Sequence, residues 1–180
     1  DRLTWTEFEQ IVSYFSGDPR MQCYLTLAVE SLGRPQEICY RRIKDVEWHE
    51  QFARIWVSDH GKEGTKALQC IDSFPYLVKW YEIHPFQNNR DAYLFPRCFK
   101  PDQPMKPHTI ANRLHVACRE LGIQKRITGY SLTRNGVTFS RLRGDSDVEI
   151  QHRAGWTSTK QLRTYDLSTT EDSFRRQLVR

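Results

Sequence analysis

Residues 45–71 read DVEWHEQFARIWVSDHGKEGTKALQCI, and this stretch decides the fold class of the chain. β-Branched and aromatic residues alternate with polar ones over residues 45–49 and 52–57, a pattern typical of half-buried strands. A glycine-containing turn at residues 61–64 leads into a third run of this kind at residues 67–71. We therefore predict three short antiparallel strands.

Helical patterns lie on both sides of these strands. Upstream, a capping box from Thr4 to Glu7 opens a helix that ends at residues 17–19, and a second helix over residues 21–32 is closed by Gly33. A short helix begins at Pro35.

Downstream of the strands, the spacing of apolar residues is again mostly that of helices. A helix begins at Ser73, and the proline-containing residues 84–107 are predicted to be a loop. Further helices are predicted over residues 109–121, 132–142, 148–154 and 172–179. The prediction is a mostly helical α+β domain with one small three-stranded antiparallel sheet.

Size and composition limit the class of protein. The 180 residues and 21.4 kDa fit one domain, and 38% hydrophobic with 12% aromatic residues exclude a disordered chain. No apolar run is long enough to span a bilayer, so we expect no membrane partner. The five cysteines lie at least sixteen residues apart, which argues against a disulfide framework or a zinc site and favours a reducing, intracellular location.

The positive charge is concentrated in the second half of the chain. Residues 1–90 hold 11 basic and 13 acidic side chains, whereas residues 91–180 hold 16 and 9. Residues 97–143 contain ten Lys or Arg against two acidic side chains. Two interpretations remain open from charge alone, a surface that binds nucleic acid and an ordinary solvated surface.

Three side chains suited to phosphate chemistry lie at the ends of predicted elements: Arg34, Lys62 and Tyr165. Arginine binds phosphate oxygens with a planar, permanently charged fork. A tyrosine hydroxyl attacks phosphorus only if its proton is removed, and the departing 5′-oxygen needs a general acid. Each of the three residues, taken alone, is more often a surface or core residue.

Taken in order, the motifs resemble the catalytic domain of the tyrosine recombinases, also called the phage integrase family. The residues that carry the resemblance are Leu32-Gly33-Arg34-Pro35-Gln36-Glu37-Ile38, the turn Gly61–Lys66, and Ala154-Gly155-Trp156-Thr157-Ser158 followed by Tyr165. The resemblance extends from Thr4 to about Ser168, and residues 61–96 look most like archaeal-type integrases.

The resemblance implies a site-specific DNA recombinase, or integrase, that cleaves and rejoins DNA through a 3′-phosphotyrosyl intermediate. Tyr165 would be the nucleophile, Lys62 the general acid, and Arg34 and Trp156 the groups that hold the scissile phosphate. It implies no metal ion or other cofactor, because the cationic side chains take the metal's place. The histidines agree, since none shows HxxxH or HExxH spacing.

The sequence departs from the family at its second arginine. Aligned without gaps from Gly155, the chain has Thr133 at the arginine position and Tyr130 at the preceding histidine position. Three explanations are open: Arg134 supplies the missing guanidinium, Thr133 is an acquired or engineered inactivating change, or the domain binds DNA without cutting it. A residue one position along a helix points about 100° away, so we rank Arg134 below the substitution.

The resemblance also implies double-stranded DNA as partner and self-association on it as a dimer or tetramer. The predicted DNA contacts are Lys66, Asn112, Arg113, Arg119, Arg141 and Arg143. We expect a catalytic domain at residues 1–168 and a tail helix within residues 169–180, which docks either on a neighbouring protomer or on its own domain. An N-terminal DNA-binding domain is expected to be missing, because the sequence begins Asp1-Arg2 without Met. The protein would act in the cytoplasm or nucleoid, or on host DNA as a viral or mobile-element protein.

Overall fold

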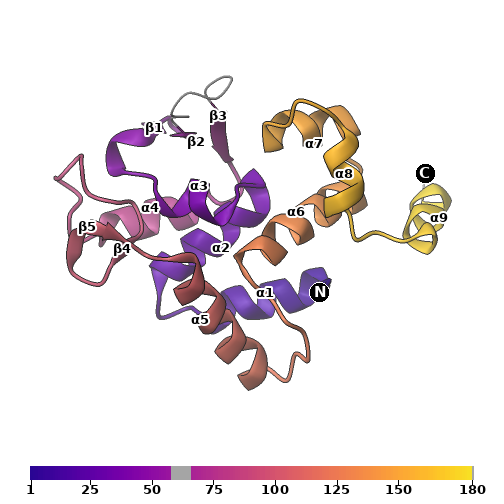
Figure 1. Cartoon of the computed structure of the whole chain (residues 1–180), viewed down its shortest axis with the longest axis horizontal. Coiled ribbons are helices and arrows are strands. Elements are labelled where there is room, and N and C mark those ends of the chain that lie inside the picture. The colour runs from indigo at the N-terminus through magenta and orange to yellow at the C-terminus, as the bar shows by residue number, and fades with distance from the viewer. Residues whose placement is uncertain (58–65, 180) are drawn as a thin grey trace.

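The computed structural model describes residues 1–57 and 66–179, and in these ranges it is mostly helical, with two small sheets toward the edges of the view in Figure 1. The first half contains α1 (Trp5–Tyr14), α2 (Pro19–Ser31), α3 (Pro35–Cys39), the 3-10 turn Ile43–Asp45, β1 (Val46–Trp48), β2 (Ala53–Val57), β3 (Lys66–Cys70) and α4 (Phe74–Glu82). The second half contains β4 (Pro96–Arg97), β5 (Lys100–Pro104), α5 (Pro107–Glu120), α6 (Gly129–Arg143), α7 (Asp147–Ala154), α8 (Lys160–Tyr165) and α9 (Thr170–Leu178).

The predicted three-stranded antiparallel sheet is confirmed, with the order β1-β2-β3. Ile55 in β2 pairs with Val46 on one side and with Leu68 on the other. Along β2 the side chains of Ala53, Ile55 and Val57 are buried while those between them are exposed, which is the period of two seen in the sequence. One face of the sheet therefore closes the core.

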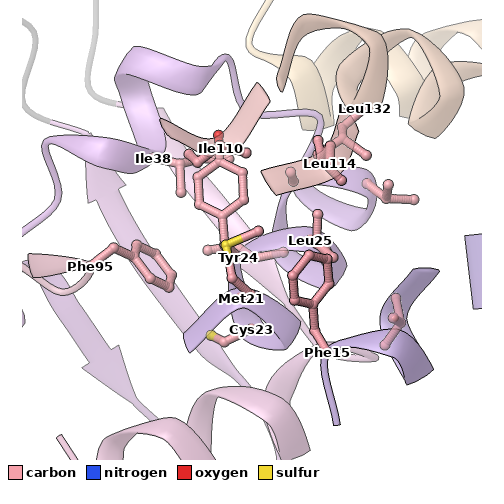
Figure 2. Close-up of a cluster of buried hydrophobic side chains, with 14 of the residues drawn as sticks. Phe15, Met21, Cys23, Tyr24, Leu25, Ile38, Phe95, Ile110, Leu114 and Leu132 are labelled. Atoms are coloured by element: carbon pink, nitrogen blue, oxygen red, sulfur yellow. The ribbon is translucent and has the colours of Figure 1, made fainter. Parts of the chain in front are cut away.

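Helix α2 lies at the centre of the main core. Most of its residues are buried, and its side chains pack with those of α1, α4, α5, β2 and β3 in one apolar cluster (Figure 2). Gly136 in α6 approaches α2 so closely that a Cβ on it would lie 2.4 Å from the carbonyl oxygen of Val29. Glycine at this position allows the two helices to touch along their backbones.

A second, smaller apolar cluster joins the C-terminal helices to the end of α2. Its buried members are Leu32, Val137, Ile150, Ala154, Trp156 and Leu162, with Tyr165 packed against them. The cluster fixes α7 and α8 against α6 and against the residues that follow α2. Because the proposed nucleophile and the first arginine motif both border it, this small core positions the candidate site.

Three local predictions were wrong. The region 84–107 is not only loop, because β4 and β5 form a two-stranded sheet in which Arg97 pairs with Lys100. Proline-containing strands lack the apolar alternation that identifies a strand in sequence. No helix is predicted directly before Tyr165, but the structure has α8 there. Its single buried residue, Leu162, is too little to give a helical pattern in the sequence.

The third correction concerns the end of α2. Leu32, not Gly33, adopts the left-handed cap conformation, with φ 58° and ψ 23°. Gly33 is needed for a different reason, since a Cβ there would lie 2.9 Å from Ile38 Cγ1 and 3.0 Å from Leu68 Cδ2. Burial of the Leu32 side chain in the smaller cluster stabilises a backbone conformation that leucine otherwise avoids.

Candidate active site and DNA-binding surface

Arg34 lies at the N-cap of α3, where the chain turns sharply after α2. Its side chain is exposed, while its backbone N–H donates to Glu37 Oε2 at 2.7 Å. The buried neighbours Gly33 and Pro35 hold the backbone on both sides. The arginine is therefore an exposed side chain on a well-packed turn, which suits a ligand for an external phosphate.

The helix that carries the second predicted motif begins regularly. Thr128 caps α6 by a reciprocal pair of contacts with Ser131, and the helix runs on from Gly129. Thr133 is 1% exposed, and its hydroxyl donates to the carbonyl oxygen of Gly33 at 2.9 Å. The side chain at position 133 thus faces the turn that carries Arg34.

The neighbours of Thr133 lie differently. Arg134 is exposed, as expected for the next position along an undistorted helix. Tyr130 is 50% exposed in the first turn of α6. The geometry therefore favours Thr133, and not Arg134, as the residue at the second-arginine position. The roles of Tyr130 and Arg134 stay predictions.

Trp156 and Tyr165 pack directly on each other. Their ring centroids lie 5.0 Å apart with an interplanar angle of 37°. Trp156 is 9% exposed and follows Gly155, which closes α7 in a left-handed conformation with φ 68°. Tyr165 is half-buried at the last position of α8, and its ring packs against that of Trp156.

The residues after Tyr165 are tied to α6. Asp166 accepts from Arg141 Nε at 2.9 Å, and the N–H of Leu167 donates to Thr138 Oγ1 at 2.8 Å. Burial raises the pKa of Asp166, but hydrogen bonds from Ser168 and Arg141 outweigh burial and hold the pKa below its ordinary value. The carboxylate is therefore charged at neutral pH and anchors the C-terminal side of the nucleophile.

The predicted general acid, Lys62, lies outside the described residues. Lys66, predicted as a DNA contact, begins β3, and its ammonium group lies 2.9 Å from Glu37 Oε2. Its side chain is 16% exposed. The structure thus brings together the Arg34 turn, Thr133, Lys66 and the Trp156–Tyr165 pair.

Two of the predicted DNA contacts line one groove. Asn112 and Arg119 on α5 face a groove of about 840 Å³ whose other wall is formed by residues 122–128. His115, Lys125 and Arg126 line the same groove. Sequence analysis did not select Lys125 and Arg126, although both belong to the basic stretch 97–143.

The other four predicted DNA contacts, Lys66 among them, have carboxylate partners within the chain. Arg113 pairs with Asp18, Arg141 pairs with Asp147 and Asp166, and Arg143 pairs with Asp145 and Asp72. Their role in DNA binding stays a prediction, and each would have to share or exchange a carboxylate to contact phosphate.

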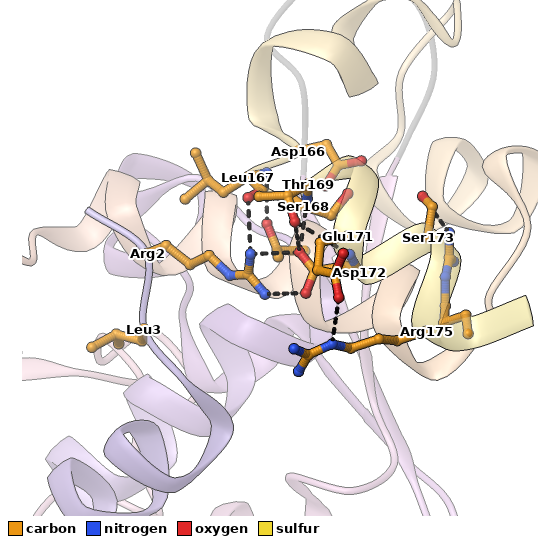
Figure 3. A network of polar contacts seen from close by, with 12 residues as sticks. Arg2, Leu3, Asp166, Leu167, Ser168, Thr169, Glu171, Asp172, Ser173 and Arg175 are labelled. Carbon is orange, nitrogen blue, oxygen red and sulfur yellow. Dashed lines mark hydrogen bonds and ion pairs between the residues drawn. The ribbon is translucent and has the colours of Figure 1, made fainter. Parts of the chain in front are cut away.

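Several ion pairs join the acidic first half of the sequence to the basic second half. Asp18 pairs with Arg113, Glu7 lies 2.6 Å from Lys125 Nζ, and Asp72 lies 3.7 Å from Arg143. One pair has the opposite arrangement, with the cation in the first half and the carboxylate in the second. Both terminal nitrogens of Arg2 donate to the Asp172 carboxylate, at 2.7 and 3.1 Å (Figure 3). The charge asymmetry of the sequence is therefore partly neutralised inside the fold.

Two further observations concern metals and membranes. Over residues 1–57 and 66–179, no group of three or more His, Cys, Asp or Glu side chains is placed to hold a metal ion. None of the helices in the same ranges is both long and apolar enough to cross a bilayer.

Comparison with known proteins identifies the family. The model of the phage integrase family matches residues 1–171, so the chain belongs to the phage integrase family. A search of curated protein sequences finds no match.

Solved structures show the same fold. A XerA recombinase is similar with a TM-score of 0.86 at 19% identity, over 99% of this chain and 63% of that chain. A XerH site-specific recombinase bound to palindromic difH substrate gives 0.76 at 16% identity, over 99% and 52%. A lambda integrase tetramer bound to a Holliday junction gives 0.69 at 17% identity, over 92% and 48%. The chain thus spans less than two thirds of each of these proteins.

Proposed function

We propose that the protein is a site-specific DNA recombinase that cleaves and rejoins DNA through a 3′-phosphotyrosyl intermediate. One observation carries the proposal: Tyr165 packs on Trp156 in a cluster that also contains Leu32, two residues before Arg34. Family membership supports it, and so do similar recombinases whose structures were solved as a post-cleavage complex with difH substrate and as a tetramer bound to a Holliday junction. The proposal places the site of action on DNA within a cell.

The proposed reaction is a transfer between two oxygens at one phosphorus. The Tyr165 hydroxyl loses its proton, and its oxygen bonds to phosphorus as the bond from phosphorus to the 5′-oxygen breaks. Lys62 supplies a proton to that leaving oxygen, and Arg34 binds the non-bridging oxygens as their charge increases. A free 5′-hydroxyl later attacks the phosphotyrosine and releases the tyrosine.

The role of Thr133 decides how active this sequence is. The side chain faces the Arg34 turn but carries no positive charge, and loss of one such stabilising group costs about 10²–10³ in rate. The alternative, a recombinase-derived module that binds DNA without cleaving it, is not favoured by family membership. It rests on Thr133 alone.

A nicked suicide substrate separates the two functions. If the proposal is right, the protein forms a covalent adduct with the nicked DNA, and the adduct disappears in Tyr165→Phe. Thr133→Arg should raise the rate of adduct formation by about 10²-fold, because position 133 faces Arg34. Arg134→Ala should leave the adduct unchanged, and loss of the adduct in this variant would instead assign the second-arginine role to Arg134.

DNA affinity tests the binding surface. We propose that the groove between α5 and residues 122–128 contacts the phosphate backbone. Arg119→Met should weaken binding to all sequences and reduce the slope of log affinity against log salt by about 0.9. Unchanged binding in Arg119→Met would show that Arg119 does not contact DNA and would contradict the assignment of this groove to the DNA interface.

The tail helix α9 is held on its own domain by polar contacts. Arg2 contacts Asp172 (Figure 3), and Arg176 donates to the carbonyl oxygen of Arg141. Its apolar side chains Phe174 and Leu178 are 56% and 70% exposed. We propose that these polar contacts hold α9 on free protein and that its apolar side chains contact a neighbouring protomer on DNA, as a dimer or tetramer.

Two variants test the tail. Phe174→Ser with Leu178→Ser should reduce self-association on DNA carrying two sites while leaving binding to a single site unchanged. Asp172→Asn weakens the contact to Arg2 and should leave self-association intact. Equal self-association in wild type and the double variant would refute docking on a neighbour.

A further inference from the structure

Lys66 contacts two parts of the candidate site that are far apart in sequence. Its ammonium group binds Glu37 Oε2, the same oxygen that accepts the backbone N–H of Arg34. The distances are 2.9 and 2.7 Å, respectively. The Glu37 carboxylate therefore joins Lys66 to the turn that carries the first arginine.

The methylene groups of the same side chain lie against the turn before Trp156. A Cβ added to Gly155 would lie 2.8 Å from Lys66 Cδ and 3.2 Å from Lys66 Cγ. Glycine at this position thus leaves room for the lysine stem, in addition to permitting a positive φ. The lysine stem therefore packs at the end of α7, directly before Trp156, the residue whose ring contacts Tyr165.

The burial of Lys66 distinguishes it from a surface lysine. Its side chain is 16% exposed and that of Glu37 is 23% exposed. A lysine that binds DNA phosphate keeps its ammonium group in solvent until the DNA arrives. Here the ammonium group already has a carboxylate partner, and withdrawing it would leave that carboxylate half-buried without its cation.

We infer that Lys66 is a positioning residue that sets the Trp156–Tyr165 pair relative to Arg34, and not a ligand of DNA phosphate. It acts through Glu37 on one side and through Gly155 on the other. The role of the assembled site in DNA cleavage rests on the proposed function, whereas the positioning itself does not. Such placement matters because a displacement of about 1 Å in an active site costs about 10²-fold in rate.

The test measures the environment of Trp156 without DNA. The protein is labelled with 5-fluorotryptophan, and the Trp156 resonance is assigned from Trp156→Phe. Lys66→Met keeps most of the apolar stem but loses the charge, and we expect it to shift or broaden the Trp156 resonance while that of Trp5, on α1, stays unchanged. Glu37→Gln should give the same change, and Lys79→Met, an exposed lysine on α4, should give none.

DNA binding supplies the second measurement. The salt slope of Lys66→Met should equal that of wild type, whereas loss of a phosphate contact would reduce it by about 0.9. On the nicked substrate at saturating DNA, the rate of adduct formation should fall at least about tenfold, with partial recovery in Lys66→Arg. Melting curves of each variant confirm that it is folded.

The outcomes separate this inference from the proposed function. An unchanged Trp156 resonance in folded Lys66→Met overturns the positioning role, and so does a reduced salt slope. Absence of any adduct, even with Thr133→Arg, counts against the proposed function and leaves the fluorine result to decide the role of Lys66.

Discussion

Removing the hydroxyl of Thr133 should destabilise the domain measurably. The hydroxyl is buried and donates to the carbonyl oxygen of Gly33 across a sequence separation of 100 residues. In Thr133→Val the shape is kept, but the carbonyl loses this donor in a buried environment, which costs about 1–3 kcal/mol. For a domain of this size each kcal/mol lowers Tm by about 2–4 °C, so we expect a decrease of roughly 2–12 °C.

Thermal unfolding followed by circular dichroism measures this change. Thr26→Val is the matched control, because its hydroxyl donates to the Gln22 carbonyl within the same helix at 2.8 Å and is only half-buried. We expect the control to change stability by less than about 0.5 kcal/mol. If the two valine variants melt together, the contact between α6 and the Arg34 turn does not stabilise the fold as described.

Two further predictions concern the core and acid stability. Gly136→Ala should lower the free energy of unfolding by about 1–3 kcal/mol in urea titrations, because its Cβ would lie 2.4 Å from the Val29 carbonyl oxygen. Gly17→Ala, with open space around it, should leave that free energy nearly unchanged. Burial lowers the pKa of His84, whose Nδ1 accepts the N–H of Phe86, so protonation favours the unfolded chain. This contribution to stability should be fully present above about pH 6.5 and decrease as the pH falls below it, and His84→Gln should weaken this dependence.

Strongly periodic elements could be predicted from the sequence. The alternation in residues 53–57 gives β2, and the capping box at Thr4 gives the start of α1, because both depend on local chemistry. By contrast, α8 has one buried residue and β4–β5 is held by backbone pairing, so neither leaves a periodic pattern. Such elements form because the rest of the fold supports them.

The candidate site also has features that the sequence predicts and features that depend on the folded chain. The sequence predicts Arg34, Trp156 and Tyr165 as site residues. The structure packs Trp156 and Tyr165 in one small apolar cluster that also contains Leu32, two residues before Arg34. The sequence does not distinguish a basic side chain with a carboxylate partner, such as Lys66, from one that lines a surface groove, such as Arg119. Their difference depends on Glu37 and Gly155, which become neighbours of Lys66 only after folding.

The ion pairs between the two halves of the chain link folding to ionic conditions. Glu7, Asp18 and Asp72 each hold a cation from the second half, so the opposite charges of the halves attract while the chain is still open. Salt that weakens the attraction between a polyanion and the protein surface also weakens these ion pairs. Concentrated electrolyte should therefore weaken the proposed binding to DNA and also slow refolding. A fragment containing only residues 91–180 would keep its full excess of positive charge, because the acidic partners from the first half are missing.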